Sequence, residues 1–76
     1  MSYSGVRIEI KGRVQGVGFR PTVYRIAKQY KLRGQIYNNI SGVIIELWNN
    51  KKTIKKFLDI LPTELPKLAK IDSITQ

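Results

Sequence analysis

The alternation of apolar and polar positions predicts a strand at the start of the chain and a helix after it. Residues Val6 to Lys11 alternate strictly, which is typical of a strand with one buried face. Further along, one apolar stripe has the i, i+3, i+4, i+7 spacing of a helix and is formed by Val23, Ile26, Ala27 and Tyr30. Pro21 suits the first turn of this helix, and Gly34 is a natural residue to end it.

A β-hairpin is predicted in the middle of the chain. Gln35 to Asn39 is a short strand with Ile36 facing inward, and Asn39 to Gly42 has the residues of a turn. Val43 to Trp48 is rich in branched and aromatic residues and has the strongest strand character in the chain. One face of that strand is expected to be buried and carries Val43, Ile45 and Leu47.

The last third of the chain predicts a second helix and a final strand. Asn49 or Asn50 can cap the helix, and Pro62 ends it. Its apolar stripe repeats the helical spacing and consists of Ile54, Phe57, Leu58 and Leu61. Residues Ile71 to Thr75 are a short last strand.

This order of elements predicts an α+β fold. Two helices with one apolar stripe each must cover one face of an antiparallel sheet of four strands. That arrangement is the ferredoxin-like βαββαβ sandwich. A length of 76 residues makes a single domain over residues 1–76.

The composition narrows the chemistry that this domain can perform. There is no His and no Cys, so the chain cannot build a Ser-His-Asp or Cys-His nucleophile, a disulfide or a thiolate metal site. The acidic residues are scattered along the sequence as Glu9, Glu46, Asp59, Glu64 and Asp72. We therefore expect no metal and no cofactor, and chemistry that depends on Arg, Lys, Asn, backbone N–H groups and water.

Neither a membrane-spanning run nor a signal peptide is visible in the sequence. We expect a cytoplasmic location and no membrane partner. The net charge of +9 has two interpretations. It either keeps a lysine-rich surface soluble or attracts anions, such as a nucleic acid or a small phosphate ester.

The segment from Gly12 to Pro21 is the most informative stretch of the chain. A loop with glycines before a helix leaves backbone N–H groups uncovered, which is how proteins hold phosphate. It ends in Arg20, whose guanidinium matches phosphate oxygens. Neither the P-loop nor the dinucleotide-binding pattern fits, because no Lys-Ser/Thr pair follows and Pro21 replaces the third glycine.

Two segments of the chain resemble the acylphosphatase family. The signature loop of that family is similar to Gly12-x-Val14-Gln15-Gly16-Val17-x-Phe19-Arg20. A second family segment is similar to Gly34-Gln35-Ile36-Tyr37-Asn38, followed by Gly42-Val43. The family fold is the same βαββαβ sandwich. Members of the family hydrolyse acyl phosphates, so the resemblance of these two segments implies that activity.

The resemblance also implies roles for particular residues. Arg20 would bind the phosphate and Asn38 would position the attacking water. The anion cradle would be formed by the backbone N–H groups of Gly16, Val17, Gly18, Phe19 and Arg20. Independently of the resemblance, the amide of Gln15 is expected to brace the loop through hydrogen bonds, with no catalytic role. Inorganic phosphate would be product and inhibitor.

A finer resemblance concerns Gly16 to Pro21, Val23 to Ala27 and the stretch from Pro66 to Ile74, with Thr22 as a departure. These stretches are similar to the acylphosphatase-like domain at the N-terminus of the hydrogenase-maturation carbamoyltransferases. This implies an excised domain of a longer protein, with carbamoyl phosphate as the substrate and the downstream domains as partners.

Two other functions are compatible with the same fold. One is a phosphate-binding module that docks or senses without turnover. The other is RNA binding, since RNA-recognition domains share the βαββαβ plan. The strand segments Val6–Lys11 and Val43–Leu47 carry no aromatic residue on which bases could stack, so no nucleic-acid partner is expected.

Overall fold

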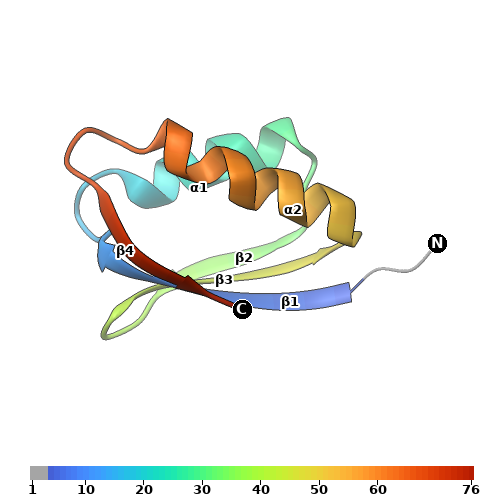
Figure 1. The fold of residues 1–76 in the computed structure, drawn as a ribbon, viewed down its shortest axis with the longest axis horizontal. Helices are drawn as coiled ribbons and strands as arrows, with labels where there is room; N and C mark the ends of the chain where they lie inside the picture. Colours follow the sequence, from blue (N-terminus) through green and yellow to red (C-terminus); the bar gives the residue numbers. More distant parts are fainter. Residues whose placement is uncertain (1–3) are drawn as a thin grey trace.

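A computed structural model describes residues 4–76 and contains two helices on one face of a four-stranded sheet (Figure 1). All pairings are antiparallel, and the strand order is β2-β3-β1-β4. The elements are β1 Ser4–Arg13, α1 Phe19–Gln29, β2 Gly34–Asn38, β3 Gly42–Asn49, α2 Lys51–Ile60, a 3-10 turn Leu61–Glu64, and β4 Lys70–Thr75. The predicted fold, including the short last strand, is confirmed.

The core lies between the sheet and the helices. It contains residues of both predicted helical stripes and also Phe19, which neither stripe included, whereas Ala27, Tyr30 and Leu58 of the stripes are only partly buried. The sheet contributes Ile8, Ile10, Val43, Ile45 and Leu47, and the helices contribute Phe19, Val23, Ile26, Ile54 and Phe57. Each of these side chains is buried. Ile44 is also only 1% exposed although it points to the other face of the sheet, where it lies between Glu9 on β1 and Tyr37 on β2.

Helix α1 ends earlier than the sequence suggests. Its last residue is Gln29, and the residue in the left-handed conformation is Lys31, with φ 55°. The N–H of Leu32 donates to Ala27 O at 2.8 Å and that of Lys31 to Lys28 O at 3.2 Å. These two bonds are the Schellman pattern, which satisfies the last carbonyls of a helix. The expectation that Gly34 ends the helix is therefore wrong.

Gly34 instead opens β2 at a place where two backbones approach closely. Its φ is 155°, and a Cβ there would overlap the carbonyl oxygen of Glu46 on β3. The link between α1 and β2 is held by Asn49, whose Oδ1 accepts from Arg33 N at 2.7 Å. The cap of α2 is Asn50, which accepts from Thr53 N at 2.8 Å.

Gly12 brings β1 against β4 at an irregularity in their pairing. The register shifts between Lys11 and Gly12, and Gly12 has φ 139°. A Cβ at this position would overlap Lys70 O. The chain then leaves the sheet at Arg13, so this close approach sets the point from which the loop toward α1 departs.

Substituting Gly34 by Ala is expected to destabilise the fold by about 2–4 kcal/mol, because the backbone of β2 or β3 must move to accommodate the methyl group. Urea unfolding followed by circular dichroism measures this loss. Lys55→Ala, an exposed change on α2, should stay within about 0.5 kcal/mol. An unchanged midpoint for Gly34→Ala would contradict the close approach.

Candidate functional site

The loop between β1 and α1 turns sharply at two glycines. Gly16 has φ 71° and Gly18 has φ 83°, a left-handed conformation that other residues rarely adopt. Gly18 is the N-cap of α1, and no side chain caps this helix end. Among the hydrogen bonds of residues 4–76, none is donated by the backbone N–H groups of Gly16 to Arg20. Uncommitted donors at a helix N-terminus are the usual elements of an anion site.

The space beside this loop is open on one side. A Cβ at Gly16 would meet no atom within 4 Å, whereas one at Gly18 would lie 3.8 Å from the ring of Pro66. Gly16 thus faces solvent and Gly18 faces the segment before β4. An anion can therefore approach from the Gly16 side.

Arg20 lies in the first turn of α1 and is exposed. The ion pairs among the described residues are Arg25–Glu64 at 3.3 Å and Lys55–Asp59 at 3.8 Å. No carboxylate within residues 4–76 therefore pairs with Arg20. Its guanidinium adds positive charge to the end of the helix that already attracts anions.

Asn38 is the last residue of β2 and lies on the face of the sheet that the helices cover. It pairs with Val43, and Ile36, two residues earlier, pairs with Ile45. Both β3 residues belong to the core, and side chains two apart in a strand share a face. Asn38 is exposed, and its side-chain amide makes no hydrogen bond to any described residue.

Gln15 ties the loop to the turn that follows Asn38. Its Nε2 donates to Asn39 O and to Gly42 O, each at 2.7 Å. These bonds join segments 24 and 27 residues apart in the sequence. They hold the loop that begins α1 next to the end of β2, as the expected bracing role requires. The geometry therefore brings the Gly16–Arg20 donors and Asn38 to the same end of the molecule.

The β2–β3 turn, which the sequence predicts at Asn39 to Gly42, is held by the side chain of Asn39. Its Oδ1 accepts from Ser41 N at 3.0 Å and Gly42 N at 2.8 Å, and its Nδ2 donates to Glu9 Oε2 at 3.2 Å. Asparagine commonly bonds to the backbone two or three residues ahead in this way. The pattern Asn-x-x-Gly was the signal available in the sequence.

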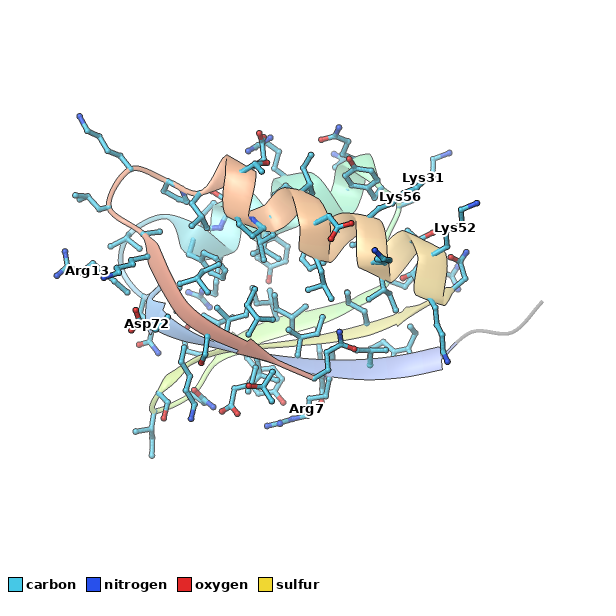
Figure 2. The ribbon with its side chains drawn as sticks, viewed as in Figure 1. Arg7, Arg13, Lys31, Lys52, Lys56 and Asp72 are labelled. Atoms are coloured by element: carbon cyan, nitrogen blue, oxygen red, sulfur yellow. The ribbon has the colours of Figure 1, made fainter. Side chains whose placement is uncertain are left out.

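The positive charge is spread over the molecule and is not concentrated at this site. Arg13 projects at the end of the molecule that carries the β1–α1 loop, while Lys31, Lys52 and Lys56 project near the opposite end (Figure 2). Arg7 projects from the open face of the sheet. Most of the charge therefore acts on an anion only through the summed field.

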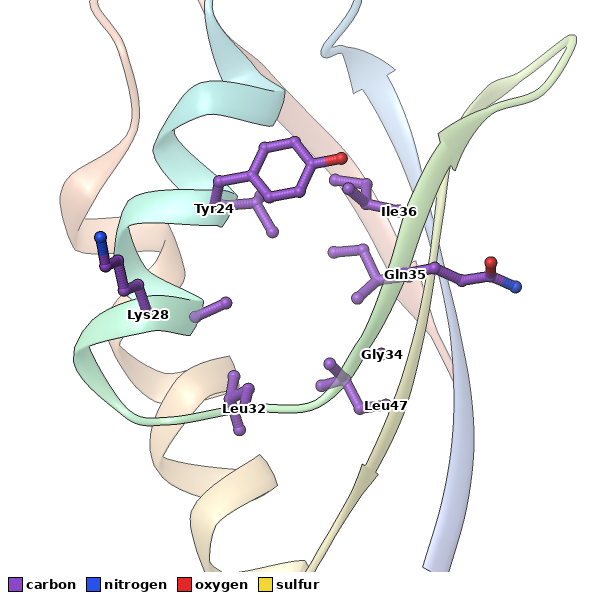
Figure 3. A pocket seen from close by; sticks show the side chains of 10 residues that line it. Tyr24, Lys28, Leu32, Gly34, Gln35, Ile36 and Leu47 are labelled. Atoms are coloured by element: carbon purple, nitrogen blue, oxygen red, sulfur yellow. The ribbon is translucent and has the colours of Figure 1, made fainter.

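An apolar cavity of about 380 Å³ lies between α1 and the β2–β3 edge of the sheet (Figure 3). Tyr24 lines it from α1 and Ile36 from β2. These residues follow Arg20 by four positions and precede Asn38 by two. A second cavity, of about 220 Å³, lies on the open face beside Trp48. Neither Arg20 nor Asn38 lines either of these two cavities.

Two further features are absent among the described residues. Between Ser4 and Gln76 there is no group of three or more carboxylate, His or Cys side chains that could hold a metal ion. Within the same range, none of the helices has the length and apolar character that crossing a bilayer needs.

The chain belongs to the acylphosphatase family, whose model matches residues 6–76. A probable carbamoyltransferase HypF from Methanocaldococcus jannaschii is 46% identical over 69 residues, which are 91% of this chain and 9% of that protein. The chain thus spans about a tenth of the length of the HypF proteins that it matches.

Two solved structures show the same fold. A full-length HypF in a phosphate- and nucleotide-bound form superimposes with a TM-score of 0.90 at 43% identity, covering 97% of this chain and 10% of that one. An acylphosphatase from Bacillus subtilis superimposes with a TM-score of 0.79 at 30% identity, covering 93% and 79%. The domain is thus similar both to a part of HypF and to most of a separate acylphosphatase.

Replacing Gln15 by Ala should destabilise the domain by about 1–2 kcal/mol, because both hydrogen bonds to the β2–β3 turn are lost. Urea unfolding gives the value. Gln29→Ala on exposed α1 surface is the matched control and should change stability by less than about 0.5 kcal/mol. Equal stability of the two variants would show that Gln15 does not hold the loop.

Proposed function

We propose that this domain hydrolyses the carboxyl–phosphate bond of acyl phosphates at the end of the molecule that carries Gly16–Arg20 and Asn38. The observation that supports this most is the set of uncommitted N–H donors beside Arg20, in a chain of the acylphosphatase family. In this proposal the N–H groups of Gly16, Val17, Gly18, Phe19 and Arg20 surround the phosphate, and the Arg20 guanidinium binds two of its oxygens.

The same proposal gives Asn38 the task of orienting water. Its amide can donate and accept without titrating, so it can hold a water molecule over the phosphorus. The water oxygen forms a bond to phosphorus while the bond from phosphorus to the carboxyl oxygen breaks. The carboxylate leaves, and a phosphate oxygen takes the proton of the water. No side-chain base is needed, because positioning and charge stabilisation supply the catalysis.

The natural substrate in this proposal is carbamoyl phosphate, which yields carbamate and phosphate. The relatives that support it are the HypF carbamoyltransferases, in which the matched region is a small part of a long chain. We therefore propose that this domain is the N-terminal domain of such a protein, acts in hydrogenase maturation, and passes its product to downstream domains.

A module that binds phosphate without turnover is the alternative that the HypF similarity favours. The full-length HypF that superimposes on this domain is a phosphate- and nucleotide-bound form. Holding phosphate requires only the N–H donors and Arg20, whereas turnover also requires a water held by Asn38. An isolated domain that binds phosphate but leaves acyl phosphates intact would support this alternative.

RNA binding is disfavoured by the two central strands of the sheet. β1 carries no aromatic side chain on which a base could stack, and the aromatic residue of β3 is Trp48, which packs against Gly5. On the open face of these two strands Glu9 and Glu46 balance Arg7 and Lys11, so there is no excess of positive charge to attract a phosphate backbone.

Replacing Arg20 by Ala should lower kcat/KM for acyl phosphates about a hundredfold to a thousandfold, because the transition-state charge loses its main side-chain partner. Arg20→Lys should also be severe, because an ammonium group lacks the two-pronged geometry. Asn38→Ala should lower kcat, with less effect on inhibition by phosphate. Release of phosphate from acetyl and carbamoyl phosphate is the measurement.

Arg25→Ala is the matched control, since Arg25 lies on the same helix and pairs with Glu64. It should keep kcat/KM within about twofold of the native value. Inorganic phosphate should compete with the substrate in the native protein. Native turnover in both Arg20→Ala and Asn38→Ala would refute the assignment of the site.

A further inference from the structure

Each polar atom of Asn39, the residue after Asn38, makes a hydrogen bond. Its backbone N–H donates to Gly42 O at 2.9 Å, and its backbone carbonyl accepts from Gln15 Nε2 at 2.7 Å. Its Oδ1 accepts from Gly42 N at 2.8 Å, and its Nδ2 donates to Glu9 Oε2 at 3.2 Å. The exposed side chain of Asn38 makes no hydrogen bond to any described residue. The position of Asn38 therefore depends on its backbone, and thus on how Asn39 is held.

Glu9 and Gln15 hold the β2–β3 turn at two separate points. Glu9 lies on β1 and accepts from the side chain of Asn39, whereas Gln15 lies in the loop after β1 and donates to two backbone carbonyls of the turn. Because β3 lies between β1 and β2 in the sheet, the contact from Glu9 links β1 to the end of β2. One attachment alone would allow the turn to rotate about it. Two attachments fix the orientation of the turn as well as its distance from the loop.

The carboxylate of Glu9 lies on the face of the sheet opposite to the candidate site. Ile8 and Ile10, its neighbours in β1, both face the core, so Glu9 points to the open face. Asn38 lies on the face that the helices cover. A carboxylate among the N–H donors would repel a phosphate, but Glu9 is separated from them by the sheet. Glu9 can therefore act on the site only through Asn39.

Glu9 also selects the orientation of the Asn39 amide. An ionised carboxylate only accepts hydrogen bonds, so it binds the NH2 end of that amide. The Oδ1 end is then left to accept from Ser41 N and Gly42 N. The reversed amide would place two oxygens against each other at Glu9 and donors against donors in the turn. Loss of the carboxylate therefore removes the contact that makes one orientation favourable over the other.

We propose that Glu9 is a positioning residue for the hydrolysis, because it orients Asn39 and thereby fixes the backbone that carries Asn38. The inference rests on the proposed function for the task of Asn38, which is to hold the attacking water. It adds that the hydrogen bond from Asn39 to Glu9 affects the reaction of bound substrate, while the loop and Arg20 bind phosphate without it.

Replacing Glu9 by Ala should lower kcat for acetyl phosphate about tenfold, because the water is held less precisely. The inhibition constant of inorganic phosphate should stay within about twofold, since Glu9 contacts neither the loop N–H groups nor Arg20. Glu9→Gln should restore kcat to within about twofold of the native value, because its amide oxygen still accepts from Asn39. Phosphate release is measured at a temperature at which circular dichroism shows every variant to be folded.

Glu46→Ala is the matched control for the loss of a carboxylate on the open face. Glu46 accepts from Gln35 and does not contact the turn, so this variant should keep native kcat. Native kcat in Glu9→Ala would overturn the inference. Equal losses of kcat and of phosphate affinity would indicate a general loosening of the fold and would also overturn it. A loss in Glu9→Gln as large as in Glu9→Ala would show that the charge acts and not the hydrogen bond.

Amide hydrogen exchange tests the positioning without any turnover. In Glu9→Ala the backbone N–H groups of Asn39 and Gly42 should exchange at least about tenfold faster than in the native domain, while that of Ile45 in β3 keeps its rate. This exchange pattern in a domain that hydrolyses no acyl phosphate would refute the proposed activity and support Glu9 as the residue that orients the turn. Native kcat and native exchange in Glu9→Ala would support the activity and refute the inference.

Discussion

The two hydrogen bonds from Gln15 to the β2–β3 turn are the contacts on which the candidate site depends. The N–H donors of the loop and the amide of Asn38 come from segments that do not pair with each other in the sheet. The side-chain amide of Gln15 links them by donating to Asn39 O and to Gly42 O, and Gly42 O also accepts from the backbone N–H of Asn39 at 2.9 Å. The side chain of Asn39 holds the β2–β3 turn and connects it to Glu9 on β1. The site is therefore positioned by amide groups, and the charged Arg20 is left free of this framework.

Local periodicity predicted the fold because each element buries one stripe or one face. The positions of Val43, Ile45 and Leu47, and of Ile54 and Phe57, were readable because alternation and helical spacing are local properties. The end of α1 could not be predicted in this way. Lys31 adopts a left-handed conformation within a Schellman motif, and the Asn49 side chain then accepts from Arg33 N. That contact spans 16 residues, and no sequence window around the helix contains it.

The loop was predicted from its residue types, but the reasons for its glycines were only partly visible. Gly16 and Gly18 are required by their left-handed backbone, which turn chemistry indicates from sequence. Gly12 and Gly34 are also required by close contacts with Lys70 O and Glu46 O, which belong to neighbouring strands. Such approaches become visible only when strand pairing is known. The sequence pattern therefore explains Gly16 and Gly18 in the loop better than it explains Gly12 and Gly34 in the strands.

The edge position of β2 explains why an apolar cavity lies beside the candidate site. β2 has a neighbouring strand on one side only, and it is short, with Ile36 as its one inward-facing apolar side chain. α1 covers this edge with Ala27, a small residue, so the space between helix and strand is not filled. Packing in the rest of the core is carried by larger side chains such as Phe19 and Phe57. The cavity and the candidate site therefore lie on the same two elements but use different residues.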